Sequence, residues 1–266
     1  MKKTLTVLIV AAILLSIGLT ACGGGAGEDW KYIEKKGEII VGITYFEPMN
    51  YLEGNGELTG FETEFTNAVC EILKVKPKFQ VINWKTKEIE LEAKNIDCIW
   101  NGMTIDGERA ARMSISRPYM ENKQVLVVKA ENVSKLKESV DGLVIVAEAG
   151  SAGETAAEKA EFFKDAKYTA VDTQAKALME VAAGTADGCV IDYVASIGMI
   201  GEGTDFAGLL AVEERGYGQE EYGIAVRKED SEFTKKINDA IQQLIDNGKL
   251  VEIAKKYKLE ELLIMD

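Results

Sequence analysis

Residues able to grip both charged ends of a small zwitterion stand in two separate parts of the chain. In the first part, Gly102 and Thr104 lie where an apolar run passes into the start of an expected helix, and Arg109 follows within it. Backbone N–H groups at a helix start can hold an anion, and a guanidinium can form two parallel hydrogen bonds with a carboxylate. In the second part, Asp192 could accept hydrogen bonds from an ammonium group. Together these residues predict a clamp for the two charges of an α-amino acid.

Two of these residues also have a purely structural interpretation. Arg109 could form a surface ion pair with Asp106 or Glu108, because an isolated charged side chain is usually solvated. Asp192 could cap the N-terminus of a helix. The residues alone leave both alternatives open.

The two parts share a local pattern that favours a common site. Residues 95–102 and residues 185–192 each follow an expected helix and contain an aspartate, an apolar run and a polar tip. In open α/β sheets, ligands bind beyond the carboxyl ends of the strands. Residues Asn101 to Thr104 and Asp192 are therefore candidate site residues from opposite halves of the chain, although two βα units can share such a pattern without sharing a site.

The elements that would position these residues alternate along the chain. Short apolar or alternating runs predict strands, and apolar residues at helical spacing, such as Phe61, Phe65 and Val69, predict amphipathic helices. Strands are expected at 38–43, 78–82, 97–101, 124–129, 142–147, 168–171, 189–192 and 222–226. Helices are expected at 30–36, 61–73, 85–94, 153–164, 173–183 and 232–257, the last interrupted at 247–248. This alternation indicates an α/β protein with parallel sheets and helices on their faces.

Composition argues against several classes of function. The 266 residues include no histidine, so the commonest general base and metal ligand is missing. Cys70, Cys98 and Cys189 form no Cys-x-x-Cys pair, so neither a metal nor a cofactor is expected. We expect Cys98 and Cys189 to be buried core residues, while one disulfide stays possible. The net charge of −13 would repel phosphate backbones, so nucleic-acid binding is not expected.

The N-terminus predicts export and lipid attachment. Two lysines precede an apolar run without charge, and the small Ala21 stands directly before Cys22. The run is shorter than the roughly 20 residues of a membrane-spanning helix, and its parts are those of a secretory signal. With Leu19-Thr20-Ala21-Cys22 as its lipobox, it resembles a bacterial lipoprotein signal. The resemblance implies a signal peptide at 1–21, lipid on the Cys22 thiol, a tether and lead-in at 22–37, and an extracytoplasmic protein anchored to the membrane.

Several motifs in the body of the chain resemble those of one family. They are, in order, Val41-Gly42-Ile43, residues 58–62, residues 97–109, Ser116-Arg117-Pro118-Tyr119 and residues 222–228. In this order they resemble the amino-acid-binding proteins of bacterial ABC importers, with the type II periplasmic-binding fold, over about residues 38–256. The resemblance implies two lobes, each a mostly parallel sheet flanked by helices, joined by a two-segment hinge. Lobe 1 would comprise 38–128 and 223–266, lobe 2 would comprise 131–216, and the hinge would lie near 129–130 and 217–222.

The resemblance also implies roles for individual residues. Phe46 would cover the ligand and Trp84 would contact it from the opposite side, although both would otherwise be ordinary core residues. Gly102 and Thr104 would donate to the ligand carboxylate and Arg109 would form its fork. Asp192 would accept from the ammonium group, and Ser151 would contact the carboxylate end from lobe 2. Asn101 stands in the same strand tip where the family often has a small hydroxyl residue, and it is a further candidate.

Selectivity for the ligand side chain is expected to depend on an acid. Glu148 lies at the end of the first strand of lobe 2, near where the side chain of an amino acid would point. We hypothesise that Glu148 or Glu47 selects a polar or basic side chain. The structural alternative for Glu148 is a solvated acid beside a helix start, where negative charge is favourable.

The function implied by the resemblance is capture of a free amino acid by closure of the lobes and delivery to the permease and ATPase subunits of an ABC importer. The protein would be a monomer without enzymatic activity. One alternative is an enzyme of the same fold, such as a prephenate or arogenate dehydratase, in which Glu148 and Asp192 would do acid–base work. The lack of histidine, nucleophile motif and metal ligands argues against it. A receptor sensor is the other alternative, disfavoured because no membrane span is expected before the chain ends at Asp266.

Overall fold

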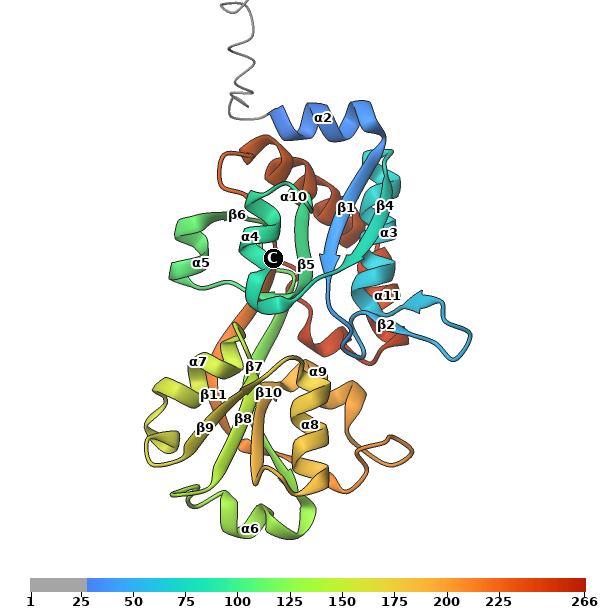
Figure 1. Cartoon of the computed structure of the whole chain (residues 1–266). Helices are drawn as coiled ribbons and strands as arrows, with labels where there is room; N and C mark the ends of the chain where they lie inside the picture. Colours follow the sequence, from blue (N-terminus) through green and yellow to red (C-terminus); the bar gives the residue numbers. More distant parts are fainter. Residues whose placement is uncertain (1–27) are drawn as a thin grey trace, which may run out of the picture.

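Two lobes lie one above the other, and two long strands run between them (Figure 1). The computed structural model describes residues 28–266, with the side chains of all of these except residue 28 and residues 213–215. The expected signal peptide and the expected lipid attachment at Cys22 lie outside the described residues.

The first lobe, at the top of Figure 1, is built on three parallel strands in the order β4–β1–β5. These strands are β1 (Glu38–Ile43), β4 (Lys76–Val81) and β5 (Cys98–Thr104), and β6 (Met113–Ile115) and the end of β11 (Leu209–Arg227) extend the sheet. A small hairpin is formed by β2 (Tyr51–Leu52) and β3 (Leu58–Thr59). The helices of this lobe are α2 (Glu28–Lys36), α3 (Phe61–Leu73), α4 (Lys87–Glu92), α5 (Gly107–Arg112), α10 (Ser231–Asp246) and α11 (Lys249–Lys256), with short 3-10 turns at Trp84–Thr86 and Glu260–Leu262.

The second lobe, at the bottom of Figure 1, contains the parallel strands β10, β8 and β9, with β7 antiparallel to β10. The strands are β7 (Met120–Lys129), β8 (Val144–Glu148), β9 (Lys167–Val171) and β10 (Gly188–Asp192). The helices are α6 (Val133–Leu136), α7 (Ala152–Lys159), α8 (Gln174–Ala183) and α9 (Tyr193–Met199), with 3-10 turns at Ala130–Asn132 and Glu161–Phe163.

Helix α3 shows how the apolar pattern builds the first lobe. Phe61, Phe65 and Val69 follow one another at i, i+4 spacing and are buried against the sheet. The ring of Phe65 meets Trp100 of β5 edge-on, with the ring centroids 5.0 Å apart. This packing positions β5 against α3. The carboxyl end of β5 therefore lies where the first lobe faces the second.

Strand β7 pairs with β11 along its length and gains β10 as a second partner in the second lobe, and so it links the lobes. Met120 pairs with Tyr222 of β11 in the first lobe, whereas residues 124–128 pair with β10 in the second. β11 runs back beside β7 from Leu209 to Tyr222. The expected end of lobe 1 at residue 128 lies within the part of β7 that pairs with both β11 and β10.

The structure also contains elements that were not expected from the sequence. The apolar pattern of the sequence predicts neither α9 nor the first half of β11. Charged residues and two glycines interrupt the apolar pattern between 213 and 218, and the pairing with β7 shifts between Val212 and Gly216 and again before Gln219. The helix expected at 153–164 ends at Lys159, and a 3-10 turn follows.

The cysteines of the described body are buried and unpaired. Cys70, Cys98 and Cys189 all have free thiols, and burial raises the pKa of each. The expected core positions of Cys98 and Cys189 are therefore confirmed. Within residues 28–266, no helix combines the length and the apolar character that a membrane span requires.

Candidate functional site

A cavity between the lobes brings together all nine candidate ligand-binding residues. Its lining consists of Phe46, Trp84, Asn101, Gly102, Thr104 and Arg109 from the first lobe, and Glu148, Ser151, Ala152, Gln174 and Asp192 from the second. The space between these side chains is about 10 Å³, which is room for about one water molecule. The lobes are thus closed on one another, and an amino acid could enter only after they had moved apart.

Arg109 belongs to this cavity and also forms the ion pair that was its structural alternative. It lies in α5, only 7% exposed, and its Nε is 3.3 Å from a carboxylate oxygen of Asp106. Its Nη1 donates to the carbonyl of Thr104 at 3.1 Å, and its Nη2 donates to the carbonyl of Gly150 in the second lobe at 3.2 Å. The ion pair therefore orients a guanidinium that faces the cavity, where it can receive a carboxylate.

Asp192 ends β10 and is surrounded by amide groups. Its Oδ1 accepts from Asn122 Nδ2 and Gln124 Nε2, both at 2.7 Å, and its Oδ2 accepts from Gln174 Nε2. Burial raises the pKa of Asp192, and these hydrogen bonds oppose that rise. Asp192 precedes α9 but makes no side-chain capping bond to it. The capping alternative is therefore wrong, and the carboxylate faces the cavity.

Glu148 is buried at the end of β8, with 4% of its surface exposed. Its Oε1 has no hydrogen-bond partner within the described part of the chain. Burial raises the pKa of Glu148 to about 8, and repulsion from Asp192 adds to this effect. The alternative of a solvated acid is therefore wrong. A buried acid with an unpartnered oxygen can accept a donor from a ligand side chain.

The aromatic residues close the cavity on the side of the first lobe. Phe46 and Trp84 are both buried, and the Nζ of Lys87 lies 4.7 Å from the centroid of the Trp84 ring. Ser151 begins α7 from the second lobe, where its hydroxyl oxygen accepts from the N–H of Glu154 at 3.0 Å. That bond leaves the hydroxyl hydrogen of Ser151 able to donate into the cavity.

At the tip of β5, the hydrogen bonds differ from the expected set. The N–H of Gly102 donates to the buried carboxyl of Glu62 at 2.8 Å, so its expected role as a carboxylate donor is not supported. Gly102 has φ 56, and an added Cβ would lie 2.9 Å from the Phe46 ring, so the position needs a glycine. The Thr104 hydroxyl donates to Glu220 at 3.1 Å. Asn101 uses its amide to donate to Thr44 at 2.6 Å.

Sequence reasoning missed three polar residues at or beside the cavity. Gln174 begins α8 and bonds both the carboxylate and the backbone N–H of Asp192. Lys87 is buried in α4, and Glu220 lies in β11. The one available signal for Gln174 was its place at the start of the helix expected at 173–183, just beyond a strand, because the carboxyl ends of strands gather at one edge.

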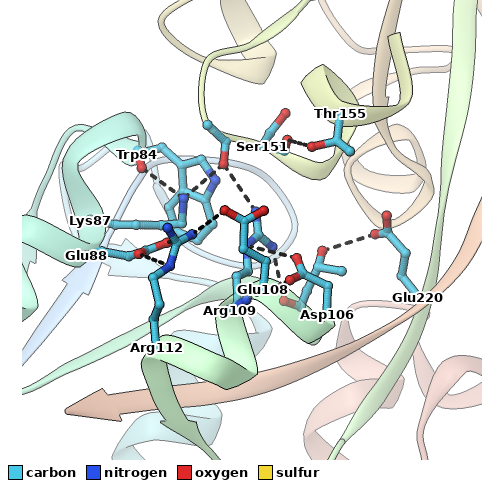
Figure 2. A network of polar contacts seen from close by, with 12 residues as sticks. Trp84, Lys87, Glu88, Asp106, Glu108, Arg109, Arg112, Ser151, Thr155 and Glu220 are labelled. Atoms are coloured by element: carbon cyan, nitrogen blue, oxygen red, sulfur yellow. Dashed lines mark hydrogen bonds and ion pairs between the residues drawn. The ribbon is translucent and has the colours of Figure 1, made fainter. Parts of the chain in front are cut away.

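Lys87 and Arg109 both hold the same backbone carbonyl across the cleft. The Nζ of Lys87 donates to the carbonyl of Gly150 at 2.9 Å and to that of Trp84 at 3.3 Å. Burial and the nearby charge of Arg109 lower the pKa of Lys87 to about 8. Figure 2 shows the surrounding network, in which Arg112 turns outward to Glu88 and Glu108 while Arg109 pairs with Asp106.

Comparison with known proteins relates this geometry to a family. The family described as bacterial extracellular solute-binding proteins, family 3, matches residues 39–260. The L-cystine-binding protein TcyJ of Escherichia coli (strain K12) is 26% identical over 228 residues, which are 85% of this chain and 84% of that protein. The L-arginine-binding protein of Pseudomonas aeruginosa is 30% identical over 231 residues, which are 82% of this chain and 87% of that protein.

A solved structure shows the same arrangement. An ABC uptake transporter substrate-binding protein from Streptococcus pneumoniae, with bound histidine, is 30% identical and superposes with a TM-score of 0.76 over 87% of this chain and 96% of that one. The expected α/β fold of the type II periplasmic-binding class is therefore confirmed. These relatives are named for the amino acids that they bind and not for a reaction. Since the family match spans most of its length, the chain belongs to the bacterial extracellular solute-binding proteins of family 3.

Proposed function

We propose that this protein captures a polar amino acid between its lobes and delivers it to the permease and ATPase subunits of an ABC importer. The placement of Arg109 and Asp192 at one cavity, on opposite lobes, carries the proposal. A guanidinium suits the carboxylate of an amino acid and a buried aspartate suits its ammonium group. The named ligands of the relatives, which are cystine, arginine and histidine, are all polar amino acids. A monomer suffices because one chain supplies the whole lining.

Capture would proceed by closure of the hinge formed by β7 and β11. Ligand would first meet Phe46, Trp84 and Arg109 on the first lobe, and the second lobe would then bring Ser151 and Asp192 onto it. Closure buries the charges of the ligand, which is favourable only when each charge finds partners. Strand-terminal residues of two crossing segments can absorb such a rotation.

Glu148 is the acid that we propose to select the ligand side chain. Glu148 lines the cavity and has an unpartnered oxygen, whereas Glu47 is exposed and does not line the cavity. A guanidinium or ammonium group on the ligand would donate to this oxygen and favour the ionised form of Glu148. We therefore propose a basic side chain, as in arginine, as the preferred class of ligand.

Lipid attachment at Cys22 would hold the protein at the outer face of the cell membrane. The lipobox Leu19-Thr20-Ala21-Cys22 supports this proposal. Intact-mass spectrometry of protein extracted from membranes should show a chain that starts at Cys22 and carries acyl groups. A Cys22→Ser variant should be found without lipid. Unlipidated wild-type protein in the membrane-extracted fraction would contradict the anchor.

The experiment that tests the proposed function is a thermal-shift screen followed by calorimetry. L-Arginine, L-histidine, L-glutamine and L-cystine would each be added to the purified protein over a range of concentrations. A ligand that binds the folded form raises the melting temperature as its concentration increases. At least one of the four should do so and bind with 1:1 stoichiometry. No shift with any of the four ligands would contradict the proposal.

A Glu148→Gln variant tests the proposed basis of selectivity. Its affinity for L-arginine should fall by roughly tenfold or more, because a charge-assisted hydrogen bond becomes a neutral one. Its affinity for L-glutamine should change much less. An unchanged ranking of the ligands would remove Glu148 from the selectivity mechanism.

A further inference from the structure

Glu220 and Asp192 lie on either side of β7 on the same face of the sheet. The strand order is β11–β7–β10, with Glu220 opposite Asn122 and Asp192 opposite Gln124. Asn122 and Gln124 are two residues apart in β7, so their side chains share a face. The register of three strands therefore brings two carboxyls and two amides together at the junction of the lobes.

The two amides bridge the two carboxyls. Asn122 Nδ2 donates to Asp192 Oδ1 at 2.7 Å and to Glu220 Oε2 at 3.0 Å. Gln124 Nε2 donates to the same two oxygens at 2.7 and 2.9 Å. Each NH₂ group has two hydrogens, so both NH₂ groups are fully used. The two acidic oxygens lie within two hydrogen-bond lengths of each other, and Asp192 lines the cavity while Glu220 stands behind it.

The carboxylates of the buried Asp192 and the partly buried Glu220 repel each other at this separation. Burial and the charge of Asp192 raise the pKa of Glu220 to about 7, while the bonds from Gln124, Asn122 and Thr104 oppose this rise. The charge of Asp192 also raises the pKa of Tyr222 of β11, Glu62 of α3 and Glu148 of β8. All three are acids, so they disfavour a second negative charge on the pair.

We infer that Glu220 is a positioning residue of the ammonium site: in the free protein the pair Asp192–Glu220 holds one proton, and an α-ammonium group that binds to Asp192 displaces this proton to solvent. This inference rests on the proposed function. The entering cation supplies the positive charge that the proton supplied before. Both carboxylates are then ionised, and the amides of Asn122 and Gln124 keep Asp192 oriented toward the ligand.

Calorimetry in buffers of different ionisation enthalpy measures the proton directly. The wild-type protein would be titrated at pH 6.0 in phosphate, MES and Bis-Tris with whichever of L-arginine, L-glutamine and L-cystine binds most tightly. The slope of the observed enthalpy against the buffer enthalpy gives the number of protons released. At this pH most molecules carry the proton that the pair shares. We therefore expect the wild type to release about half a proton or more per bound ligand in excess of the number that Glu220→Gln releases.

Two variants serve as controls for this measurement. Glu221→Gln changes the adjacent, exposed acid of the same strand and should keep the proton count of the wild type. Glu148→Gln removes any proton that a basic ligand side chain displaces from Glu148, and it should retain the contribution that depends on Glu220. A purely structural role for Glu220 would weaken binding in Glu220→Gln without lowering the proton count.

Equal proton release by the wild type and Glu220→Gln would overturn the inference while leaving amino-acid binding intact. If Glu220→Gln does not fold, the pH dependence of the affinity of the Glu148→Gln variant decides, because this variant cannot release a proton from residue 148. Affinity should rise between pH 5.5 and about 7 and then level off, up to about tenfold per pH unit for one displaced proton, and a flat profile overturns the inference. Failure of the wild type to bind any amino acid would instead defeat the proposed function, and this inference with it.

Discussion

At the scale of single residues, the cavity gathers acids in surroundings that disfavour their charge. Glu148 and Asp192 are both buried, and burial is the largest cause of the raised pKa of each. Burying an ionised carboxylate without a partner is costly, so such a group tends to stay protonated. Arg109 is also buried, but Asp106 and two carbonyl oxygens already contact its guanidinium, which keeps further N–H groups for a ligand. Among these groups, the acids therefore have the most to gain from a cationic ligand.

The raised pKa of Glu148 predicts a pH-dependent loss of stability in the free protein. The folded state keeps a proton that the unfolded chain loses above its ordinary pKa of 4.5. The stability contributed by this group is therefore full below about pH 4.5 and is lost as the pH rises toward about 8. A Glu148→Gln variant should lose less stability than the wild type between pH 5 and 8, by on the order of 1–3 kcal/mol.

Denaturant unfolding of both proteins at pH 5, 6, 7 and 8, without ligand, would measure this difference. Glu154→Gln is unsuitable as a control because Glu154 bonds Gly150 and Tyr168. Glu158→Gln, which changes an exposed acid of α7, is a better one, and it should follow the wild type. Parallel pH profiles for the wild type and Glu148→Gln would contradict the account of Glu148.

At the scale of elements, the turn between β8 and α7 is one place where the two lobes touch. Gly150 has φ 77, its N–H donates to Glu154 at 2.7 Å, and its carbonyl points across the cleft to Lys87 and Arg109. An added Cβ at Gly150 would lie 2.9 Å from the backbone of Lys85. Because residue 150 is a glycine, the turn can approach the 3-10 turn at Trp84 closely. Lys87 and Arg109 then bind its carbonyl from the first lobe.

A Lys87→Met variant tests this contact. Methionine keeps the apolar stem beside Trp84 but cannot donate to the carbonyl of Gly150. We expect the closed form to lose about 1 kcal/mol, which is a roughly fivefold loss of ligand affinity by calorimetry. The loss is modest because the buried ammonium of Lys87 already carries a desolvation cost.

Lys85→Met is the matched control, because Lys85 is exposed and lies two residues away. It should bind the ligand as the wild type does. If Lys87→Met bound as tightly as Lys85→Met, the bridge from Lys87 to Gly150 would not contribute to closure.

At the scale of the whole molecule, the lobes meet through β7 and β11. These strands carry Asn122, Gln124 and Glu220 at the crossing, directly beside Asp192. A rotation of the lobes therefore acts on the residues that hold Asp192. The cluster of Asn122, Gln124, Glu220 and Asp192 therefore links binding of the ligand charge to closure of the lobes at the hinge.

The sequence predicted most of this architecture where the signal was local. α3 has the predicted bounds because Phe61, Phe65 and Val69 repeat at helical spacing, and β1 was predicted from a single apolar run. Arg109 and Asp192 follow strand ends, so their meeting at one edge could be anticipated. Glu220 and Lys87 could not be anticipated in this way. The position of Glu220 depends on the pairing of β11 with β7 across two register shifts, and Lys87 acts through a glycine carbonyl of the other lobe.

The central claim is that Arg109 and Asp192 hold the two charges of one amino acid across the cleft. Calorimetric titration of Arg109→Met and Asp192→Asn with the ligand of the wild type tests it most directly. Arg112→Met is the control, because Arg112 pairs with Glu88 and Glu108 at the surface. Removing one partner of a buried charge pair costs roughly 2–5 kcal/mol. We expect a loss of affinity of thirtyfold or more in both site variants and none in the control, whereas wild-type affinity in either site variant would contradict the account.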